Sequence, residues 1–163
     1  MCIRNRKEVT KLVDNTKYVK EGVVRFMDRH TPEQRRKNMQ AIKNKDSKIE
    51  ILLRKELWNR GLRYRKNVNS IYGKPDIVFF SKKVAVFCDS EFWHGYNWEL
   101  RKKDFKSHQE FWIPKIERNM ERDREVTRKL ESEGWTVLRF WGNEIKENTK
   151  QCADKIIKVI QQK

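Results

Sequence analysis

Two short apolar segments near the middle of the chain constrain its fold more than any other feature of the sequence. Residues 77–80 read Ile-Val-Phe-Phe and residues 84–87 read Val-Ala-Val-Phe, with Ser-Lys-Lys between them. Uninterrupted apolar runs of this length, rich in β-branched and aromatic residues and joined by a short polar link, are typical of buried strands. The sequence therefore predicts a buried β-hairpin.

Helical patterns flank the predicted hairpin. Residues 31–34 read Thr-Pro-Glu-Gln, with Thr as the N-cap, Pro at the first helical position and Gln at the capping-box position. Asp46 is the expected N-cap of a second helix that ends at Gly61. We expect strands at 62–68 and 135–141, helices at 114–133 and 149–161, and a functional loop at 89–111. This order predicts a single α/β domain with a mixed central sheet flanked by helices.

The charge and the aromatic content indicate the class of partner. The chain carries 39 Lys and Arg against 23 Asp and Glu, a net charge of +16, with six Trp, eight Phe and four Tyr. A basic, aromatic-rich globular chain points first to nucleic acid. Its apolar runs are too short for a membrane span, and no secretory signal pattern is present. The three cysteines lie far apart, so we expect a reduced, cytoplasmic protein.

Carboxylates surround the predicted hairpin. Asp76 precedes its first strand and Asp89 follows its second, so both are expected at one edge of the sheet, and Glu50 could add a third carboxylate. Such groups bind Mg²⁺, which activates water and neutralises a scissile phosphate. His94 adds a side chain suited to proton transfer. A turn role for Asp76 and solvated surface roles for the others are the alternatives, and metal binding by Asp89 or Glu91 stays open.

Aromatic and basic side chains are candidates for contacts with DNA. Base stacking or insertion into a duplex is the functional interpretation of the aromatic residues, and a small satellite core is the alternative. Arg36 and Lys37 are candidates for phosphate contacts. There is no CxxC pair, and the histidines lack metal-binding spacing. The aromatic residues in question are Phe92, Trp93, Tyr96, Trp98, Phe111 and Trp112.

Four separated segments, in the same order, resemble the very-short-patch repair (Vsr) family of DNA mismatch endonucleases. This family has a restriction-endonuclease-like core, and the resemblance covers about residues 31–160. Any one segment alone would be weak evidence, but together they are highly specific. The segments are Arg36–Ile42, Ile49-Glu50 with Lys74-Pro75-Asp76, Phe92-Trp93-His94, and Phe111–Ile116 running on to Asn119, Arg122 and Asp123, and Gly134–Leu138 with Trp141 also matches.

The resemblance implies a role for each matched residue. Asp76 would bind the metal together with the backbone carbonyl of Cys88, and Glu50 would order the water. His94 would be the catalytic histidine. The residues implied at the DNA are Phe92, Trp93 and Trp112 as aromatics that enter the duplex, Met39 on the opposing side, and Lys115 and Asn119 facing the mispaired bases.

Two departures from the family pattern affect the expected cofactors and site. Many members of the family hold a structural zinc with His and Cys residues after the catalytic histidine and after the late Trp. Here those stretches read Gly-Tyr-Asn-Trp at 95–98 and Trp-Gly-Asn at 141–143, so we expect Mg²⁺ but no structural zinc. Asp89 stands where zinc-bearing relatives often have a second histidine, which makes the site more acidic and adds Asp89 to the catalytic candidates.

The sequence and the resemblance together predict a Mg²⁺-dependent endonuclease that nicks one strand of double-stranded DNA. The expected target is a T·G mismatch left by deamination of 5-methylcytosine. A restriction or defence nuclease of the same fold and a non-catalytic basic DNA-binding protein are the alternatives. We expect residues 27–163 to form the endonuclease domain and residues 1–26 a basic extension. The protein is expected to act as a monomer, with mismatch-repair proteins or a cognate cytosine methyltransferase as candidate partners.

Overall fold

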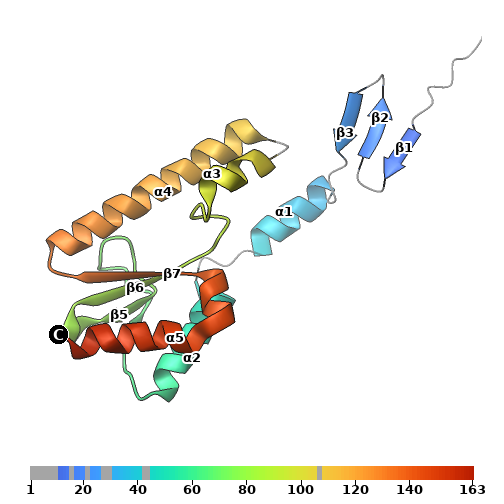
Figure 1. Cartoon of the computed structure of the whole chain (residues 1–163). Helices are drawn as coiled ribbons and strands as arrows, with labels where there is room; N and C mark the ends of the chain where they lie inside the picture. Colours follow the sequence, from blue (N-terminus) through green and yellow to red (C-terminus); the bar gives the residue numbers. More distant parts are fainter. Residues whose placement is uncertain (1–10, 15–16, 21–22, 27–30, 42–44, 106–107) are drawn as a thin grey trace, which may run out of the picture. The chain divides into compact units, whose positions relative to one another are not determined.

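The chain forms two compact units, residues 1–43 and residues 44–163. The computed structural model describes residues 11–14, 17–20, 23–26, 31–41, 45–105 and 108–163. Figure 1 follows the elements of both units along the chain.

The first unit contains a three-stranded antiparallel sheet and a helix. β1 (Lys11–Asp14), β2 (Lys17–Lys20) and β3 (Val23–Phe26) pair in chain order. The expected basic extension gave no sign of these strands, because four-residue segments with charged ends offer too short an alternation to detect. α1 (Pro32–Ala41) begins as predicted. The Thr31 N–H donates to Gln34 Oε1 at 2.9 Å and the Gln34 N–H donates to Thr31 Oγ1 at 3.2 Å, which closes the capping box.

The second unit is built on a four-stranded mixed sheet with the order β4-β5-β6-β7. β5 pairs antiparallel with β6, so that Ile77 lies opposite Val86, and β6 pairs parallel with β7, so that Asp89 lies opposite Trp141. The predicted hairpin and the predicted α/β fold with a mixed central sheet are confirmed. The strands are β4 (Arg65–Lys66), β5 (Ile77–Phe79), β6 (Val84–Asp89) and β7 (Thr136–Trp141).

Helices cover both faces of this sheet, with α4 on one side and α2 and α5 on the other (Figure 1). Val84 and Val86 belong to the apolar cluster with α2 and α5, whereas Ala85 and Phe87 pack with α4. Neighbouring residues of a strand point to opposite faces, so the continuous apolar run of β6 is buried on both. The helices are α2 (Lys48–Asn59), α3 (Trp98–Arg101), α4 (Gln109–Ser132) and α5 (Gly142–Gln161), with 3-10 turns η1 (Phe80–Lys82) and η2 (Lys102–Asp104).

The N-cap of α2 is Ser47, not Asp46 as the sequence analysis expected. The Glu50 N–H donates to Ser47 Oγ at 3.4 Å, and the Glu50 carboxylate accepts the Ser47 N–H at 3.2 Å. This reciprocal pair satisfies two N–H groups that a helix start leaves without an intrahelical partner. Asp46 instead lies in the left-handed region with φ 55°.

Three other elements differ in length from the expectation. The strand expected at 62–68 is limited to the two residues of β4. α4 starts at Gln109 and continues through Pro114, where the helix loses one backbone hydrogen bond. α5 starts at Gly142 and contains a kink at the non-helical Asn148, next to the expected start at 149. Among the residues that the structure describes, no helix combines the length and apolar character needed to cross a membrane.

Candidate active site

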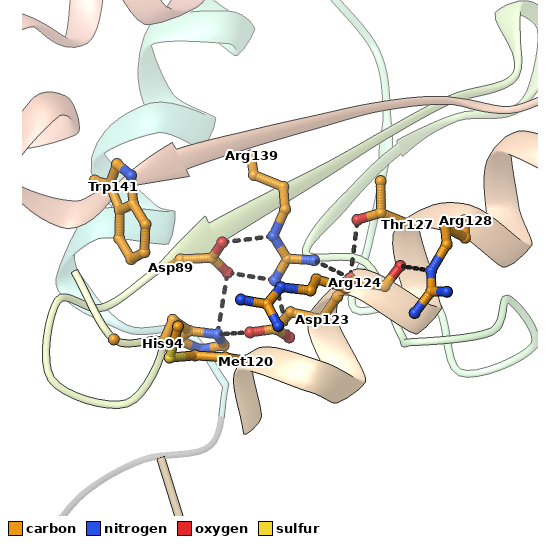
Figure 2. A pocket seen from close by; sticks show the side chains of 10 residues that line it. Asp89, His94, Met120, Asp123, Arg124, Thr127, Arg128, Arg139 and Trp141 are labelled. Carbon is orange, nitrogen blue, oxygen red and sulfur yellow. Dashed lines mark hydrogen bonds and ion pairs between the residues drawn. The ribbon is translucent and has the colours of Figure 1, made fainter. Parts of the chain in front are cut away.

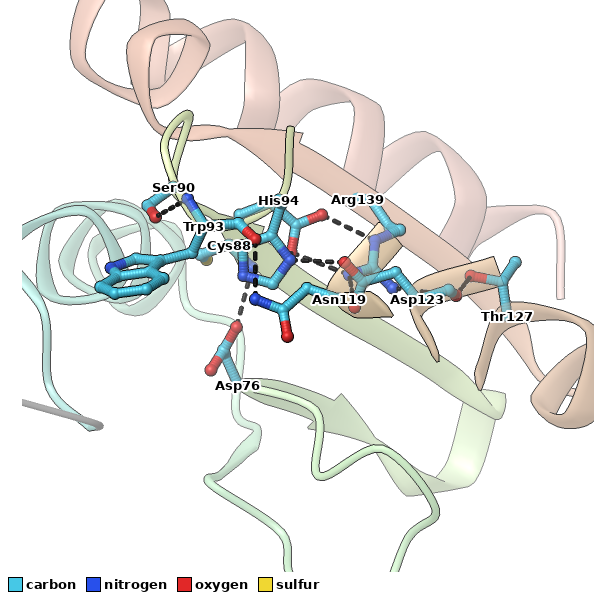
Figure 3. A network of polar contacts seen from close by, with 10 residues as sticks. Asp76, Cys88, Ser90, Trp93, His94, Asn119, Asp123, Thr127 and Arg139 are labelled. Carbon is cyan, nitrogen blue, oxygen red and sulfur yellow. Dashed lines mark hydrogen bonds and ion pairs between the residues drawn. The ribbon is translucent and has the colours of Figure 1, made fainter. Parts of the chain in front are cut away.

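The pairing of β5 with β6 brings the candidate carboxylates to one edge of the sheet. Asp76 lies just before β5, where its N–H donates to the Val86 carbonyl at 3.0 Å and its Oδ2 accepts the Cys88 N–H at 2.8 Å. Asp89 is the last residue of β6. Figure 3 shows Asp76 beside Cys88, with His94 from the following loop at the same end of the strand.

The surroundings of the Asp76 carboxylate disfavour its ionised form. Burial raises its pKa to about 7, and the negative charges of Glu50 and Asp89 act in the same direction against the opposing effects of the Cys88 N–H and Arg54. Within the described residues, the Cys88 N–H is the one hydrogen-bond donor to this carboxylate. A buried carboxylate in this state is stabilised by a cation bound beside it.

The Cys88 thiol is unreactive. Burial raises the pKa of its thiol well above the ordinary value, and the charges of Asp76, Glu50 and Asp89 raise it further. The thiol therefore stays protonated near neutral pH and offers no thiolate ligand. The backbone is the part of Cys88 that faces Asp76.

Glu50 is held in a fixed orientation near Asp76. It is 6% exposed, and its oxygens accept the N–H groups of Asp46 at 3.1 Å and Ser47 at 3.2 Å. The Nη2 of Arg54 lies 3.0 Å from Glu50 Oε2. A carboxylate has about four lone-pair sites, so capping and the ion pair leave room for a further donor such as water.

His94 belongs to a polar network that joins its loop to β6, α4 and β7 (Figure 2). Its Nδ1 lies 2.6 Å from Asp123 Oδ2 and 3.5 Å from Asp89 Oδ1. Arg139 binds Asp89 through two bonds, Nε to Oδ2 at 2.6 Å and Nη2 to Oδ1 at 2.9 Å. The Arg139 Nη2 also lies 3.0 Å from Asp123 Oδ1. Asp89 is only 5% exposed, so Arg139 rather than solvent compensates its charge.

This network selects the proton positions of His94. Burial would raise the pKa of Asp123, but the hydrogen bond and charge of His94, with the charges of Arg139 and Arg122, hold it below its ordinary value. An ionised carboxylate only accepts hydrogen bonds, so the proton shared with Asp123 belongs to His94 Nδ1. In the neutral ring, Nε2 then keeps its lone pair and is able to accept a proton.

A cavity of about 550 Å³ opens beside the network (Figure 2). Met120 and Trp141 line it together with His94. Gly95, directly after His94, has φ 71°, and a Cβ at this position would overlap the Met120 side chain. A glycine here therefore lets the loop pass close enough to α4 for His94 to reach Asp123.

An aromatic cluster of Phe92, Trp93 and Trp112 lies beside this site. The ring centroids are 4.9 Å apart for Phe92 and Trp93, 5.4 Å for Phe92 and Trp112, and 5.8 Å for Trp93 and Trp112. Lys115 Nζ lies 5.2 Å from the Trp93 ring centroid, and Asn119 Nδ2 donates to the Trp93 carbonyl at 3.0 Å. Phe92 is 38% exposed, so the cluster reaches the surface instead of forming a closed satellite core.

The other residues expected at the DNA belong to the first unit. Arg36 and Lys37 lie on α1 with exposed side chains. Met39 lies on the same helix, and its side chain falls outside the described part of the structure.

Arg139 was not predicted to be a site residue, and no contact was predicted for Asp123. A signal existed for each. Asp123 follows Asn119 by four residues and so lies on the same side of α4. Arg139 stands between Leu138 and Phe140 in the strand, where a charged side chain needs a buried partner. Neither signal identifies the residue that is contacted, because Asp89 is 50 residues from Arg139 and His94 is 29 residues from Asp123 in the sequence.

Aromatic packing occupies the region where the family resemblance would put zinc ligands. The Tyr96 and Trp141 rings lie 5.1 Å apart in an edge-on arrangement. Trp98 is 7% exposed, and its Nε1 donates to Glu117 Oε1 at 3.3 Å. Glu91 lines a small cavity of about 170 Å³ next to Tyr96 and Trp98. These contacts connect the loop to β7 and α4.

We expect the purified protein to contain no stoichiometric zinc and to melt at the same temperature with and without a zinc chelator. Tyr and Trp side chains are not zinc ligands, so a four-ligand site cannot be assembled here. Elemental analysis and thermal melts measure both quantities. Trp98→Ala, the positive control, should lower stability by about 3–5 kcal/mol because it empties a buried site. One equivalent of zinc whose removal unfolds the protein would contradict the expectation.

Comparison with known proteins identifies the family. The family described as DNA mismatch endonuclease Vsr matches residues 27–100. A type II nicking enzyme of Neisseria meningitidis serogroup C is 57% identical over 137 residues, covering 84% of this chain and 93% of that protein. A type II nicking enzyme of Haemophilus parainfluenzae is 53% identical over 135 residues, covering 82% and 96%. The DNA mismatch endonuclease Vsr of Escherichia coli K12 is 38% identical over 114 residues, covering 70% and 72%. The predicted family and enzyme class are thereby confirmed: the chain belongs to the Vsr family and is a DNA endonuclease that nicks DNA.

Proposed function

We propose that this endonuclease hydrolyses one phosphodiester of duplex DNA at T·G mismatches that arise from deamination of 5-methylcytosine, with Mg²⁺ as its metal. The observation that carries the proposal is the pair formed by His94 Nδ1 and Asp123 Oδ2, 2.6 Å apart. This pair lies at the same sheet edge as Asp76, a buried carboxylate whose pKa is raised to about 7. A histidine with a free Nε2 and a carboxylate that gains from a cation supply the two functions that metal-assisted hydrolysis needs.

Asp76 and the backbone carbonyl of Cys88 are the groups that would hold the metal. The raised pKa of Asp76 supports a cation at this point, since burial and the charge of Glu50 oppose its ionisation. Mg²⁺ usually keeps several waters and is held by one or two carboxylates, so Asp76 with a backbone carbonyl suits this ion. Bound Mg²⁺ supplies water activation and neutralises charge on the phosphate. Glu50, fixed by the capping box of α2, is suited to ordering a water molecule beside Asp76.

His94 would transfer the proton. Its Nδ1–H is held by Asp123, so Nε2 is the atom that takes a proton from the attacking water. Taking this proton makes the ring cationic, and the ionised Asp123 stabilises that charge. Asp89 acts on this step only through its contacts with Arg139 and His94.

The aromatic cluster would enter the duplex next to the cut. Insertion of apolar rings between base steps requires unstacking, which costs least where the pair is already mismatched. Lys115, above the Trp93 and Trp112 rings, is suited to contact displaced bases or phosphates, and Asn119 retains its amide oxygen for a base. Arg36 and Lys37 would contact phosphates, and Met39 would contact the DNA at the mismatch, as the family resemblance implies.

The names of the relatives leave two functions open. The relative from Escherichia coli is named a DNA mismatch endonuclease, whereas those from Neisseria and Haemophilus are named type II nicking enzymes. Restriction-associated nicking of perfectly paired DNA by the same fold stays the second candidate function. In the mismatch-repair reading, the enzyme works in the cytoplasm beside a cytosine methyltransferase or mismatch-repair proteins.

We expect the wild-type protein to nick a T·G duplex faster than the matched T·A duplex. Trp93→Ala should reduce T·G nicking by roughly 10–100-fold, the size expected when a stacking contact worth about 1–3 kcal/mol per base is lost. Trp112→Ala should act in the same direction. The measurement is the single-turnover nicking rate of each variant on both duplexes.

Trp58→Ala is the matched control, because Trp58 is a 54% exposed tryptophan on α2 that stacks under Arg63. It should leave both rates unchanged. Equal wild-type rates on T·G and T·A duplexes would favour restriction-associated nicking. Equal losses on both duplexes in Trp93→Ala would reject the insertion model.

A further inference from the structure

Arg139 contacts both of the carboxylates that lie within 3.5 Å of His94 Nδ1. We propose that Arg139 is a positioning residue for His94. By binding the carboxylate of Asp89, which is the competing partner, it keeps the His94 Nδ1–H hydrogen-bonded to Asp123. The inference rests on the proposed role of His94 in proton transfer and adds a residue that acts through it.

The guanidinium of Arg139 is fixed from three directions. It makes two hydrogen bonds to Asp89 at the end of β6 and an ion pair of 3.0 Å with Asp123 on α4. Its carbon Cζ lies 4.6 Å from the centroid of the Phe87 ring, in the packing of β6 against β7. A planar fork held in this way has little freedom to rotate, so it fixes the orientation of both carboxylates.

Two carboxylates lie within reach of the same nitrogen. His94 Nδ1 lies 2.6 Å from Asp123 Oδ2 and 3.5 Å from Asp89 Oδ1, and it carries one proton. Arg139 engages both oxygens of Asp89 and contacts the Oδ1 of Asp123, which leaves Asp123 Oδ2 for His94. The choice between the two partners therefore depends on Arg139.

Without the guanidinium, Asp89 and Asp123 would compete for the His94 Nδ1–H. Asp89, at 5% exposure, would become a buried charge without a cation, and it would repel Asp123. The His94 Nδ1–H, whose nitrogen lies 3.5 Å from Asp89 Oδ1, would then be drawn toward Asp89. A ring drawn toward Asp89 carries Nε2 away from the position that the pair with Asp123 gives it.

We expect Arg139→Gln to lower kcat for nicking by about 10²-fold, the typical cost of a small misplacement of a catalytic group. KM should stay unchanged, because the side chain of Arg139 is directed at Asp89 and Asp123 rather than at DNA. Adding Asp89→Asn to this variant removes the competing charge. The double variant should therefore be more active than Arg139→Gln, by on the order of tenfold, a coupling typical of one ion-pair network.

Arg128→Gln is the matched control, since Arg128 lines the same cavity but is 70% exposed and pairs with Glu121. It should leave kcat and the NMR signal of the His94 Nδ1 proton unchanged, whereas Arg139→Gln should shift that signal. Thermal melts establish that each variant is folded at the assay temperature. In the double variant, both substituted side chains are neutral, so no uncompensated charge is buried at position 89. Wild-type kcat in Arg139→Gln, or no gain from Asp89→Asn, would overturn the inference. Full activity of His94→Ala would instead reject the proposed function.

Discussion

Asp76→Asn is expected to abolish strand nicking and to raise the melting temperature of the metal-free protein at pH 8. Asparagine keeps the shape of the side chain, and its Oδ1 is able to accept the Cys88 N–H that Oδ2 accepts at 2.8 Å. It carries no charge to hold a divalent cation. It also removes a carboxylate whose ionisation is opposed by burial and by Glu50. Activity and stability should therefore change in opposite directions.

The pH dependence of this stability difference has a definite sign. The pKa of Asp76 is about 7 in the folded protein, against about 3.9 in an unfolded chain. The folded state therefore binds the proton more tightly, and the contribution of Asp76 is fully present below about pH 4 and lost as the pH rises to about 7. Above that, the penalty is on the order of 4 kcal/mol, or roughly 10 °C in melting temperature for a chain of this size.

Thermal melts of wild type and Asp76→Asn in a chelator, at pH 4 and at pH 8, measure this directly. The difference should be present at pH 8 and vanish at pH 4. Added Mg²⁺ should raise the melting temperature of the wild type at pH 8 but not that of Asp76→Asn. Asp154→Asn, an exposed carboxylate on α5 paired with Arg60, is the control for charge removal and should nick normally. Nicking by Asp76→Asn at the wild-type rate would remove Asp76 from the site.

The edge that gathers Asp76 and Asp89 could be predicted because it depends on local pairing. A hairpin with a four-residue link (residues 80–83) fixes its own register, so Asp76, just before the first strand, and Asp89, the last residue of the second, must share an edge. The apolar runs at 77–80 and 84–87 are long enough to identify the hairpin without any information from the rest of the chain.

The network around His94 could not be predicted in the same way. It requires the parallel pairing of β6 with β7, which aligns Phe87 with Arg139 through a crossover that contains α4. Periodicity identifies each of these elements but not the neighbour that it meets. The capping role of Glu50 does have a signal in the sequence, because Glu50 stands at the capping-box position three residues after Ser47, whereas Asp46 has Ile49 at that position.

His94→Ala is expected to reduce nicking by about 10²–10⁴-fold, the usual contribution of a positioned acid or base. Asp123→Asn should cost nearly as much, although asparagine has almost the same shape as aspartate. An amide that turns its NH₂ group toward Nδ1 requires the ring proton to be on Nε2, which then has no lone pair for the attacking water. In a related His–Asp arrangement, this loss of the correct tautomer costs about 10⁴-fold.

Single-turnover nicking rates and DNA affinities of His94→Ala, Asp123→Asn and Glu121→Gln separate this mechanism from a general effect of charge on α4. Glu121 lies on the same helix, is exposed and pairs with Arg124 and Arg128. Its substitution removes one negative charge, as Asp123→Asn does, without touching His94, so its rate should equal that of the wild type. Affinity for DNA should be retained in all three variants, because phosphate binding depends on Lys and Arg. If Asp123→Asn and Glu121→Gln have equal rates, Asp123 does not orient His94, and the 2.6 Å contact between them has only a structural role.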